Sequence, residues 1–340
     1  MVTSLVAAGG RGVRPPLTRF SLATLPTPLV GARRLREALG GPLVLIKRDD
    51  LTGFAAAGNK ARTLEFLVGD ATATGRDVLV TGGGPGSNFC AAAAVAARVA
   101  GLRCELVVYG SAPAAGEPIH PNLAAAWAAG AHVRFTGRPD REEVDLVIEE
   151  IAGELSAAGR RPYAVPRGGA CAVGAVAFVH AFEELARELD DLAVVPGAIV
   201  VATGSGGTHA GLLAGTFGTG RRWPVIGVTV SRPPSEIQPR VLELARAAAS
   251  LLDLPPAGAC DVQIVDGRGP GFGVPSSDGE RASRVALHTE GLILDPVYTA
   301  KAFAVVIDLV GAHPSAPIVF WHTGGLAAAL HHLEQRGRPG

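Results

Sequence analysis

Lysine is rare in this chain, and one lysine stands where a reactive amine would be useful. Only Lys47, Lys60 and Lys301 occur among the 31 basic residues, and the others are arginines. Arginine can replace lysine as a surface charge, but it cannot serve as a neutral amine or form a Schiff base. Lys60 follows Gly58 and Asn59 at the predicted start of a helix. We therefore expect its amine to point into a cleft, near positive helix ends that lower its pKa.

The other two lysines have structural interpretations. Lys47 lies within the alternating charges of Ile46–Asp50, and this pattern indicates salt bridges at a strand end. Lys301 lies within the predicted helix Tyr298–Val310, where we expect it on the surface. Lys60 is therefore the candidate for covalent chemistry.

Three glycine-rich turns each follow an apolar strand. They span Thr81–Asn88, Thr203–Thr208 and Trp321–Gly325. In open parallel sheets, ligands bind at the carboxyl ends of strands, and helix N-termini there bind anions. Residues Gly204–Thr208 offer successive backbone N–H donors and two hydroxyls, which favours a phosphate site, although such turns also form plain helix caps.

The common nucleotide and metal motifs do not occur. A dinucleotide fingerprint would need glycine at Ser87 or His209, and no lysine follows a glycine as a P-loop requires. The histidines form no H-E-x-x-H motif and the four cysteines form no CxxC pair, so we expect no metal site. A phosphate site without a nucleotide motif, together with an isolated lysine, predicts pyridoxal 5′-phosphate, whose aldehyde a lysine holds.

The composition is that of a globular protein with a large core. Of the 340 residues 48% are hydrophobic and 18% charged, and acidic and basic residues balance at 31 each. The formal net charge is zero, so the charge of the chain favours neither nucleic acid nor a membrane surface as a partner. The chain has no uncharged apolar stretch of the roughly 20 residues that span a bilayer. Its start lacks a signal-peptide pattern and is predicted to be a loose leader. Three of the four cysteines have apolar surroundings in the sequence, which favours reduced, buried thiols and a cytoplasmic protein.

Short apolar runs alternate with helical stretches along the chain, which predicts an α/β fold with parallel sheets. The predicted strands are Leu43–Ile46, Val78–Thr81, Glu105–Tyr109, His132–Phe135, Ala198–Ala202, Val225–Val230, Val262–Val265 and Ile318–His322. The predicted helices are Arg62–Ala73, Asn88–Ala100, Pro121–Ala129, Arg141–Ala158, Ala172–Leu189, Thr208–Gly215, Ser235–Leu252, Asp278–Thr289 and Tyr298–Val310.

Several segments, in order from Leu17 to Leu326, resemble one enzyme family. They are LIKRDDLTGFAAAGNKARTLEF, VTGGGPGSNF, ATGSGGTHAGL, GFGVPSSDG, EGLILDPVYTAKA and WHTGG. The family is that of D-cysteine desulfhydrase and 1-aminocyclopropane-1-carboxylate deaminase, pyridoxal-phosphate enzymes of fold type II. The resemblance implies two domains, each an open, mostly parallel sheet flanked by helices. Residues 1–52 and 166–340 would form the large cofactor domain and residues 53–165 a small inserted domain, with the cofactor between them and two chains in a homodimer.

The resemblance also implies roles for individual residues. Lys60 would be the Schiff-base lysine and the base at the α-carbon, Ser87 would bind the substrate carboxylate, and Tyr298 would lie beside the pyridine ring. The other implied cofactor contacts are Asn88 at the phenolic oxygen, Thr323 at the pyridine nitrogen, and Gly204, Ser205, Gly206, Gly207 and Thr208 at the phosphate. The implied substrate pocket comprises Ser87, Asn88, Phe89, Phe272 and Tyr298.

The activity that the resemblance implies is a lyase reaction on a small amino acid. In α,β-elimination of the D-cysteine desulfhydrase type, the products are pyruvate, ammonia and a β-leaving group such as sulfide. Thr299 stands where the deaminases carry glutamate, which favours the desulfhydrase branch. The alternatives are elimination or replacement on a bulkier amino acid, deamination of 1-aminocyclopropane-1-carboxylate, and a pyridoxal-phosphate-binding protein of low activity.

Four positions depart from the family pattern around the substrate and the phosphate. Gly86 and Phe89 replace glutamine and histidine on either side of Ser-Asn, Phe272 replaces a second tyrosine, and Thr63 replaces a lysine. We expect Gly86 to make room in the pocket and Phe272 to make it less polar. We expect Thr63 to leave the phosphate short of one cation.

Overall fold

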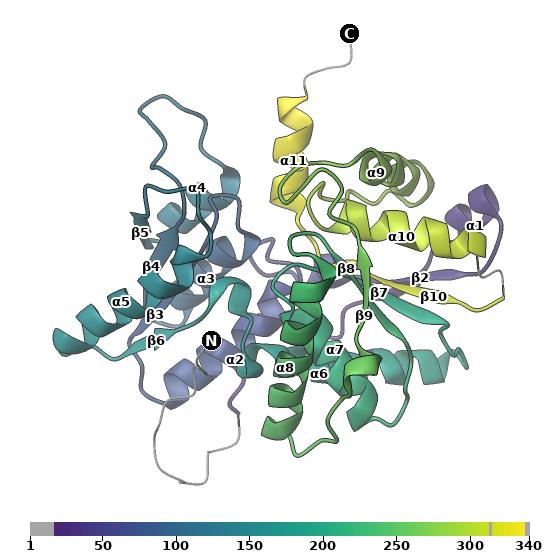
Figure 1. Cartoon of the computed structure of the whole chain (residues 1–340), viewed down its shortest axis with the longest axis horizontal. Coiled ribbons are helices and arrows are strands. Elements are labelled where there is room, and N and C mark those ends of the chain that lie inside the picture. The colour runs from purple at the N-terminus through teal and green to yellow at the C-terminus, as the bar shows by residue number, and fades with distance from the viewer. Residues whose placement is uncertain (1–16, 313–314, 337–340) are drawn as a thin grey trace.

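Two β-sheets organise the described residues, 17–312 and 315–336, of the computed structural model (Figure 1). The larger sheet has strand order β1-β2-β10-β7-β8-β9 and the smaller has strand order β5-β4-β3-β6. All neighbouring strands are parallel except β1, which pairs antiparallel with β2. The predicted α/β fold with mostly parallel sheets is confirmed. The predicted leader lies largely in residues 1–16, outside the described residues.

The larger sheet unites strands that are far apart in the sequence. Its strands are β1 (Leu29–Gly31), β2 (Val44–Lys47), β7 (Ala198–Thr203), β8 (Val225–Thr229), β9 (Gln263–Asp266) and β10 (Ile318–Trp321). Its flanking helices are α1 (Arg33–Leu39), α9 (Ser277–Glu290) and α10 (Thr299–Ala312) on one face, and α6 (Ala172–Asp191), α7 (Gly207–Gly218) and α8 (Pro234–Leu251) on the other (Figure 1).

The buried strands contribute side chains to two hydrophobic cores, because alternate side chains point to opposite faces of the sheet. Val44 and Ile46 join the core beneath α9 and α10, whereas Leu45 joins the core beneath α6 and α7. This arrangement explains why the strands are continuous apolar runs rather than alternating ones.

The smaller sheet lies beside the larger one in Figure 1. Its strands are β3 (Val78–Gly83), β4 (Arg103–Val108), β5 (His132–Phe135) and β6 (Pro162–Ala164). The remaining α-helices are α2 (Lys60–Ala73), α3 (Asn88–Val99), α4 (Pro121–Ala128), α5 (Glu143–Ala157) and α11 (Leu326–Gln335). Short 3₁₀ helices span η1 (Asp49–Leu51), η2 (Arg167–Gly169) and η3 (Ala259–Asp261).

Every predicted strand and helix occurs, with ends that differ by a few residues. Among the strands and α-helices, those that the sequence did not predict are β1, α1, β6 and α11. The strands β1 and β6 have only three residues each, too few to establish a period. Helix α2 begins at Lys60, which confirms that this lysine opens a helix.

One stretch, Arg167–Asp191, is long and apolar enough to cross a membrane, with a mean hydropathy of 1.4, but 72% of its apolar window is buried inside the protein. It contains α6, which packs against α2, α7 and α8. We interpret it as the central helix of the core.

A buried ion network fixes the start of α2 against the larger sheet. The Arg62 guanidinium donates to both oxygens of Asp49, at 3.0 and 3.1 Å, and to both oxygens of Glu184. Asp49 also accepts from the indole N–H of Trp321 at 2.8 Å. Lys47 forms ion pairs with Glu184 and Glu188, which confirms its predicted salt bridges. Burial opposes the charge of Glu184, yet Arg62 and then Lys47 lower the pKa of this carboxyl to about 2.

Replacing Asp49 with asparagine should destabilise the protein strongly, because Arg62 then loses half of its buried counter-charge. We expect the free energy of unfolding in denaturant to fall by about 3 kcal/mol in Asp49→Asn. Asp278→Asn is the control, since Asp278 pairs with Arg281 on the exposed surface of α9 and the loss there should stay below about 1 kcal/mol. Equal losses in the two variants would contradict the importance of the network.

Candidate functional site

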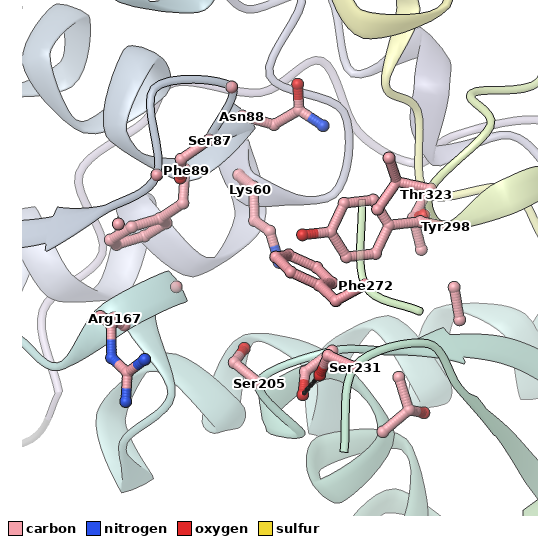
Figure 2. A pocket seen from close by; sticks show the side chains of 18 of the residues that line it. Lys60, Ser87, Asn88, Phe89, Arg167, Ser205, Ser231, Phe272, Tyr298 and Thr323 are labelled. Atoms are coloured by element: carbon pink, nitrogen blue, oxygen red, sulfur yellow. Dashed lines mark hydrogen bonds between the residues drawn. The ribbon is translucent and has the colours of Figure 1, made fainter. Parts of the chain in front are cut away.

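A cavity of about 390 Å³ lies where the two sheets meet (Figure 2). It is lined by the segments that follow β3, β7, β8 and β10, which are the carboxyl ends of parallel strands. The described residues contain no group of three or more His, Cys, Asp or Glu side chains arranged to hold a metal ion.

Lys60 reaches into this cavity from the first turn of α2 (Figure 2). Its amine has no hydrogen-bond or ion-pair partner among residues 17–312 and 315–336. Burial lowers the pKa of Lys60 to about 8, so the predicted lowering is confirmed and burial is its cause. The site therefore holds a nucleophilic amine that loses its proton easily.

The turn between β7 and α7 faces this amine across the cavity. Gly206 is the N-cap of α7 with a φ of +97°, a left-handed conformation that favours glycine. No side chain within residues 17–312 and 315–336 caps the first N–H groups of this helix. The hydroxyl of Thr208 accepts a hydrogen bond from the Asn59 side chain at 2.9 Å, which ties this turn to the residue before Lys60. Gly204, Ser205, Gly206 and Thr208 line the cavity, whereas Gly207 is buried and does not. The start of α7 therefore has the geometry that binds anions at helix N-termini.

An arginine-rich wall that the sequence did not predict lies beside this turn. Its residues are Arg141, Arg167, Arg232 and Arg240. Glu142 lies within ion-pair distance of the first three, and Asp145 pairs with Arg167 at 2.9 Å. Four guanidinium groups thus face two carboxylates, so this wall carries excess positive charge. Because arginine is common in this chain, the residue type alone did not identify these four as site residues.

Arg240 belongs to the wall and also supports the turn directly. Its Nε donates to the main-chain oxygen of Ser205 at 3.0 Å. Thr63 is buried beneath Gly169 and Gly174 and does not line the cavity. Thr63 thus contributes no charge to the cavity, whereas arginines from other segments line it beside this turn.

The opposite side of the cavity is formed by the start of α3. Ser87 is the N-cap of α3, and its hydroxyl oxygen accepts from the N–H of Cys90 at 3.2 Å. The Asn88 side-chain oxygen accepts from the Asn122 amide at 2.7 Å. Phe89 is buried and also lines the cavity. Ser87, Asn88 and Phe89 therefore lie together, as predicted for the pocket.

The expected enlargement of the pocket at Gly86 is wrong. A Cβ atom added to Gly86 would lie 3.1 Å from Nε2 of His120, so an imidazole already occupies the space. His120 lines the cavity from the N-cap of α4. No motif marks this histidine in the sequence, because its approach depends on how α4 packs beside α3.

Tyr298 and Phe272 form an aromatic edge of the cavity (Figure 2). Their rings meet edge to face with centroids 6.2 Å apart, and the Arg141 guanidinium lies 5.2 Å from the Phe272 ring centre. Burial, followed by the charge of Asp295, raises the pKa of the Tyr298 phenol, which stays protonated.

Lys301 holds the loop that carries Phe272, and its predicted exposure is wrong. The side chain is buried, and Nζ donates to the main-chain oxygens of Arg268 and Gly271 at 2.7 and 3.0 Å. The face of α10 that carries Lys301 packs against this loop rather than facing solvent.

Thr323 lies at the end of β10 and lines the cavity with a hydroxyl that has no partner in the described ranges (Figure 2). Thr299 does not line the cavity. Its hydroxyl donates to Asp295 at 2.7 Å, in the cap of α10. The side chain at position 299 therefore does not face the cavity in this protein.

Comparisons with known proteins agree with this geometry. Residues 20–324 match the family described as "Pyridoxal-phosphate dependent enzyme". A D-cysteine desulfhydrase of Salmonella newport is 37% identical over 319 residues, covering 92% of this chain and 96% of the relative. The corresponding protein of Salmonella choleraesuis is 38% identical over the same length.

Solved structures give the same assignment. A crystal structure described as the "ACC deaminase homologue" superposes with a TM-score of 0.86 at 34% identity, covering 94% of this chain and 95% of that one. An L-serine ammonia-lyase from the fungus Rhizomucor miehei has a TM-score of 0.67 at 19% identity, which shows the shared fold alone. The chain belongs to the pyridoxal-phosphate dependent enzyme family.

Proposed function

We propose that this protein is a pyridoxal-phosphate-dependent lyase that removes a β-substituent from a small amino acid by α,β-elimination. The observation that carries the proposal is that a half-buried amine without a partner in the described residues faces, across one cavity, a helix N-terminus that no described side chain caps. An aldehyde that also bears a phosphate fits both groups at once.

The residues present fit this cofactor. The start of α7 and the arginine wall would hold the phosphate, Lys60 would hold the aldehyde carbon, Asn88 would contact the phenolic oxygen and Thr323 the pyridine nitrogen. When bound, the cofactor supplies an electron sink for the pair left behind when a proton leaves the substrate's α-carbon. The neutral Thr323 hydroxyl would leave the pyridine nitrogen unprotonated, which suits elimination better than transamination.

The chain's own residues would do the remaining work. Lys60, with its pKa lowered to about 8, would take the proton from the α-carbon. The Ser87 oxygen accepts from the Cys90 N–H, and its hydroxyl would donate to the substrate carboxylate. Tyr298 would pack beside the cofactor ring.

The substrate that we favour is D-cysteine, because the D-cysteine desulfhydrases named above match nearly the whole chain. In that reaction one cysteine and one water give pyruvate, hydrogen sulfide and ammonia. The likeness to a deaminase homologue keeps 1-aminocyclopropane-1-carboxylate as an alternative substrate. The apolar Phe89 and Phe272 in the pocket keep a bulkier β-substituted amino acid as another.

We propose further that residues 1–52 with 166–340 and residues 53–165 form separate domains, since all four strands of the smaller sheet lie between Val78 and Ala164. The family resemblance supports a homodimer. Balanced charge supports a small-molecule substrate rather than nucleic acid or a membrane surface as the partner. Four cysteines without a disulfide, all in described residues, support a cytoplasmic location.

The proposed activity predicts pyruvate release from D-cysteine by the protein reconstituted with cofactor. Pyruvate and sulfide should appear in equal amounts, and β-chloro-D-alanine should also give pyruvate. Production of 2-oxobutanoate from 1-aminocyclopropane-1-carboxylate alone would favour the deaminase alternative. Turnover of none of these compounds by a protein with bound cofactor would contradict the D-cysteine assignment.

Covalent capture of the cofactor should depend on pH through Lys60. Its pKa is lowered from 10.5 to about 8, so the neutral, nucleophilic amine predominates above that pH. The rate of capture by apoprotein, followed by absorbance, should therefore rise as pH increases and level off above about 8. After borohydride reduction, mass spectrometry should find the cofactor on the peptide that contains Lys60. A Lys60→Ala variant that captures the cofactor equally well would refute the assignment.

The arginine wall predicts a specific contribution to phosphate affinity. Arg240→Gln should weaken binding of pyridoxal phosphate about 3- to 10-fold but leave the binding of pyridoxal, which lacks the phosphate, unchanged. Arg246→Gln is a matched control on the same helix, because Nε of Arg246 also donates to a main-chain oxygen, that of Ala257, but outside the cavity. Equal effects on both ligands would show that Arg240 only supports the turn.

A further inference from the structure

His120 stands beside the substrate side of the cavity in the space that a side chain at position 86 would take. Its Nε2 is the atom nearest to a Cβ built on Gly86, at 3.1 Å, and Cδ2 follows at 3.3 Å. The imidazole also lines the cavity. Gly86 immediately precedes Ser87, so the ring lies next to the start of α3.

The tautomer of His120 follows from its role as the N-cap of α4. The main-chain N–H of Asn122 donates to Nδ1 at 3.1 Å, so Nδ1 carries the lone pair and Nε2 carries the hydrogen. Burial, followed by the neighbouring His331, lowers the pKa of His120, which keeps the ring neutral at neutral pH. Nε2 has no hydrogen-bond partner in the part of the chain that the structure describes. The ring thus presents an unused N–H donor.

Contacts on two sides hold this donor in place. The Asn122 side chain donates to the main-chain oxygen of Gly86 at 2.9 Å and to Asn88 at 2.7 Å, which joins the α4 cap to the start of α3. His331 of α11 packs on the His120 ring with centroids 4.8 Å apart and planes at 65°. The position of His120 is therefore set by α4, by the turn before α3 and by α11.

We propose that His120 is a substrate-binding residue whose Nε2–H donates to the carboxylate of the amino acid, beside the Ser87 hydroxyl. A carboxylate is an acceptor with two oxygens, and one donor from each of these residues would bind both. The neighbouring start of α3 favours a negative group. Gly86 and Phe89 offer no polar side chain for this purpose. This inference rests on the proposed function, because the carboxylate is that of its amino-acid substrate.

The test compares two ligands that differ in the carboxylate. D-Alanine lacks a leaving group, and ethylamine lacks the carboxylate as well, and each can be titrated into cofactor-loaded protein and followed by the change in cofactor absorbance. In His120→Ala the dissociation constant for D-alanine should rise about tenfold or more, whereas that for ethylamine should stay unchanged. His120→Asn should behave alike, since asparagine can still cap α4 but is too short to reach the ligand. His288→Ala, at an exposed histidine of α9, is the control.

A second variant tests the geometry directly. Gly86→Ala places a methyl group against Nε2 and should also weaken D-alanine binding in the wild-type background. In the His120→Ala background the same methyl group meets no imidazole, so Gly86→Ala should have no further effect. Additive losses from the two changes would overturn the proposal, as would equal weakening of D-alanine and ethylamine or no weakening of either. Failure of the proposed function itself is distinct, because wild-type protein would then either bind no cofactor or show no change in cofactor absorbance with D-alanine.

Discussion

The contact between Asp49 and Arg62 determines where the reactive amine of this protein stands. Arg62 lies two residues after Lys60 in the first turn of α2, and Asp49 follows β2 of the larger sheet. Glu184 on α6 and Trp321 at the end of β10 complete the same network. A buried charge without its partner is costly, so these groups must keep their arrangement. The start of α2, and with it Lys60, is thereby tied to the carboxyl ends of two central strands.

The cavity places opposite demands on its basic residues. A nucleophilic amine must lose its proton easily, while an anion must be held by groups that stay charged. Burial meets the first demand at Lys60, whose pKa is about 8. Guanidinium groups meet the second, because arginine keeps its charge in such surroundings. The two kinds of residue are therefore not interchangeable within one cavity.

This division also accounts for the three lysines. Lys47 is buried in the network that positions α2, and Lys301 is bound to the loop that carries Phe272. Lys60 is the lysine whose amine faces the cavity without a partner in the described ranges. Each lysine in this arginine-rich chain thus has a particular place at or beneath the site.

The sequence predicted the parts of the site that depend on local order along the chain. The glycine-rich turns after β7 and β10 meet at one cavity because these two strands are parallel neighbours and end at the same edge of the larger sheet. The turn after β3 lines the same cavity from the smaller sheet. The arginine wall was not predictable, since Arg141, Arg167 and Arg240 approach one another only through tertiary packing. The predicted exposure of Lys301 was wrong for the same reason. Periodicity identifies a helix, but a loop distant in sequence determines which part of the helix surface is covered.

Gly86 shows why a single departure from a family pattern is a poor guide to the shape of a pocket. A glycine in place of a larger residue suggests a gap, but protein interiors are close-packed and a neighbouring group commonly occupies such a space. Here His120, at the start of the separate helix α4, occupies this space, and its Nε2 is the atom nearest to position 86. The change at position 86 therefore exchanges one polar neighbour of Ser87 for another and makes the chemistry of the pocket depend on how α4 and α11 pack. Binding of the substrate carboxylate in this protein then depends on the contact between α4 and α3, rather than on the turn at residues 86–89 alone.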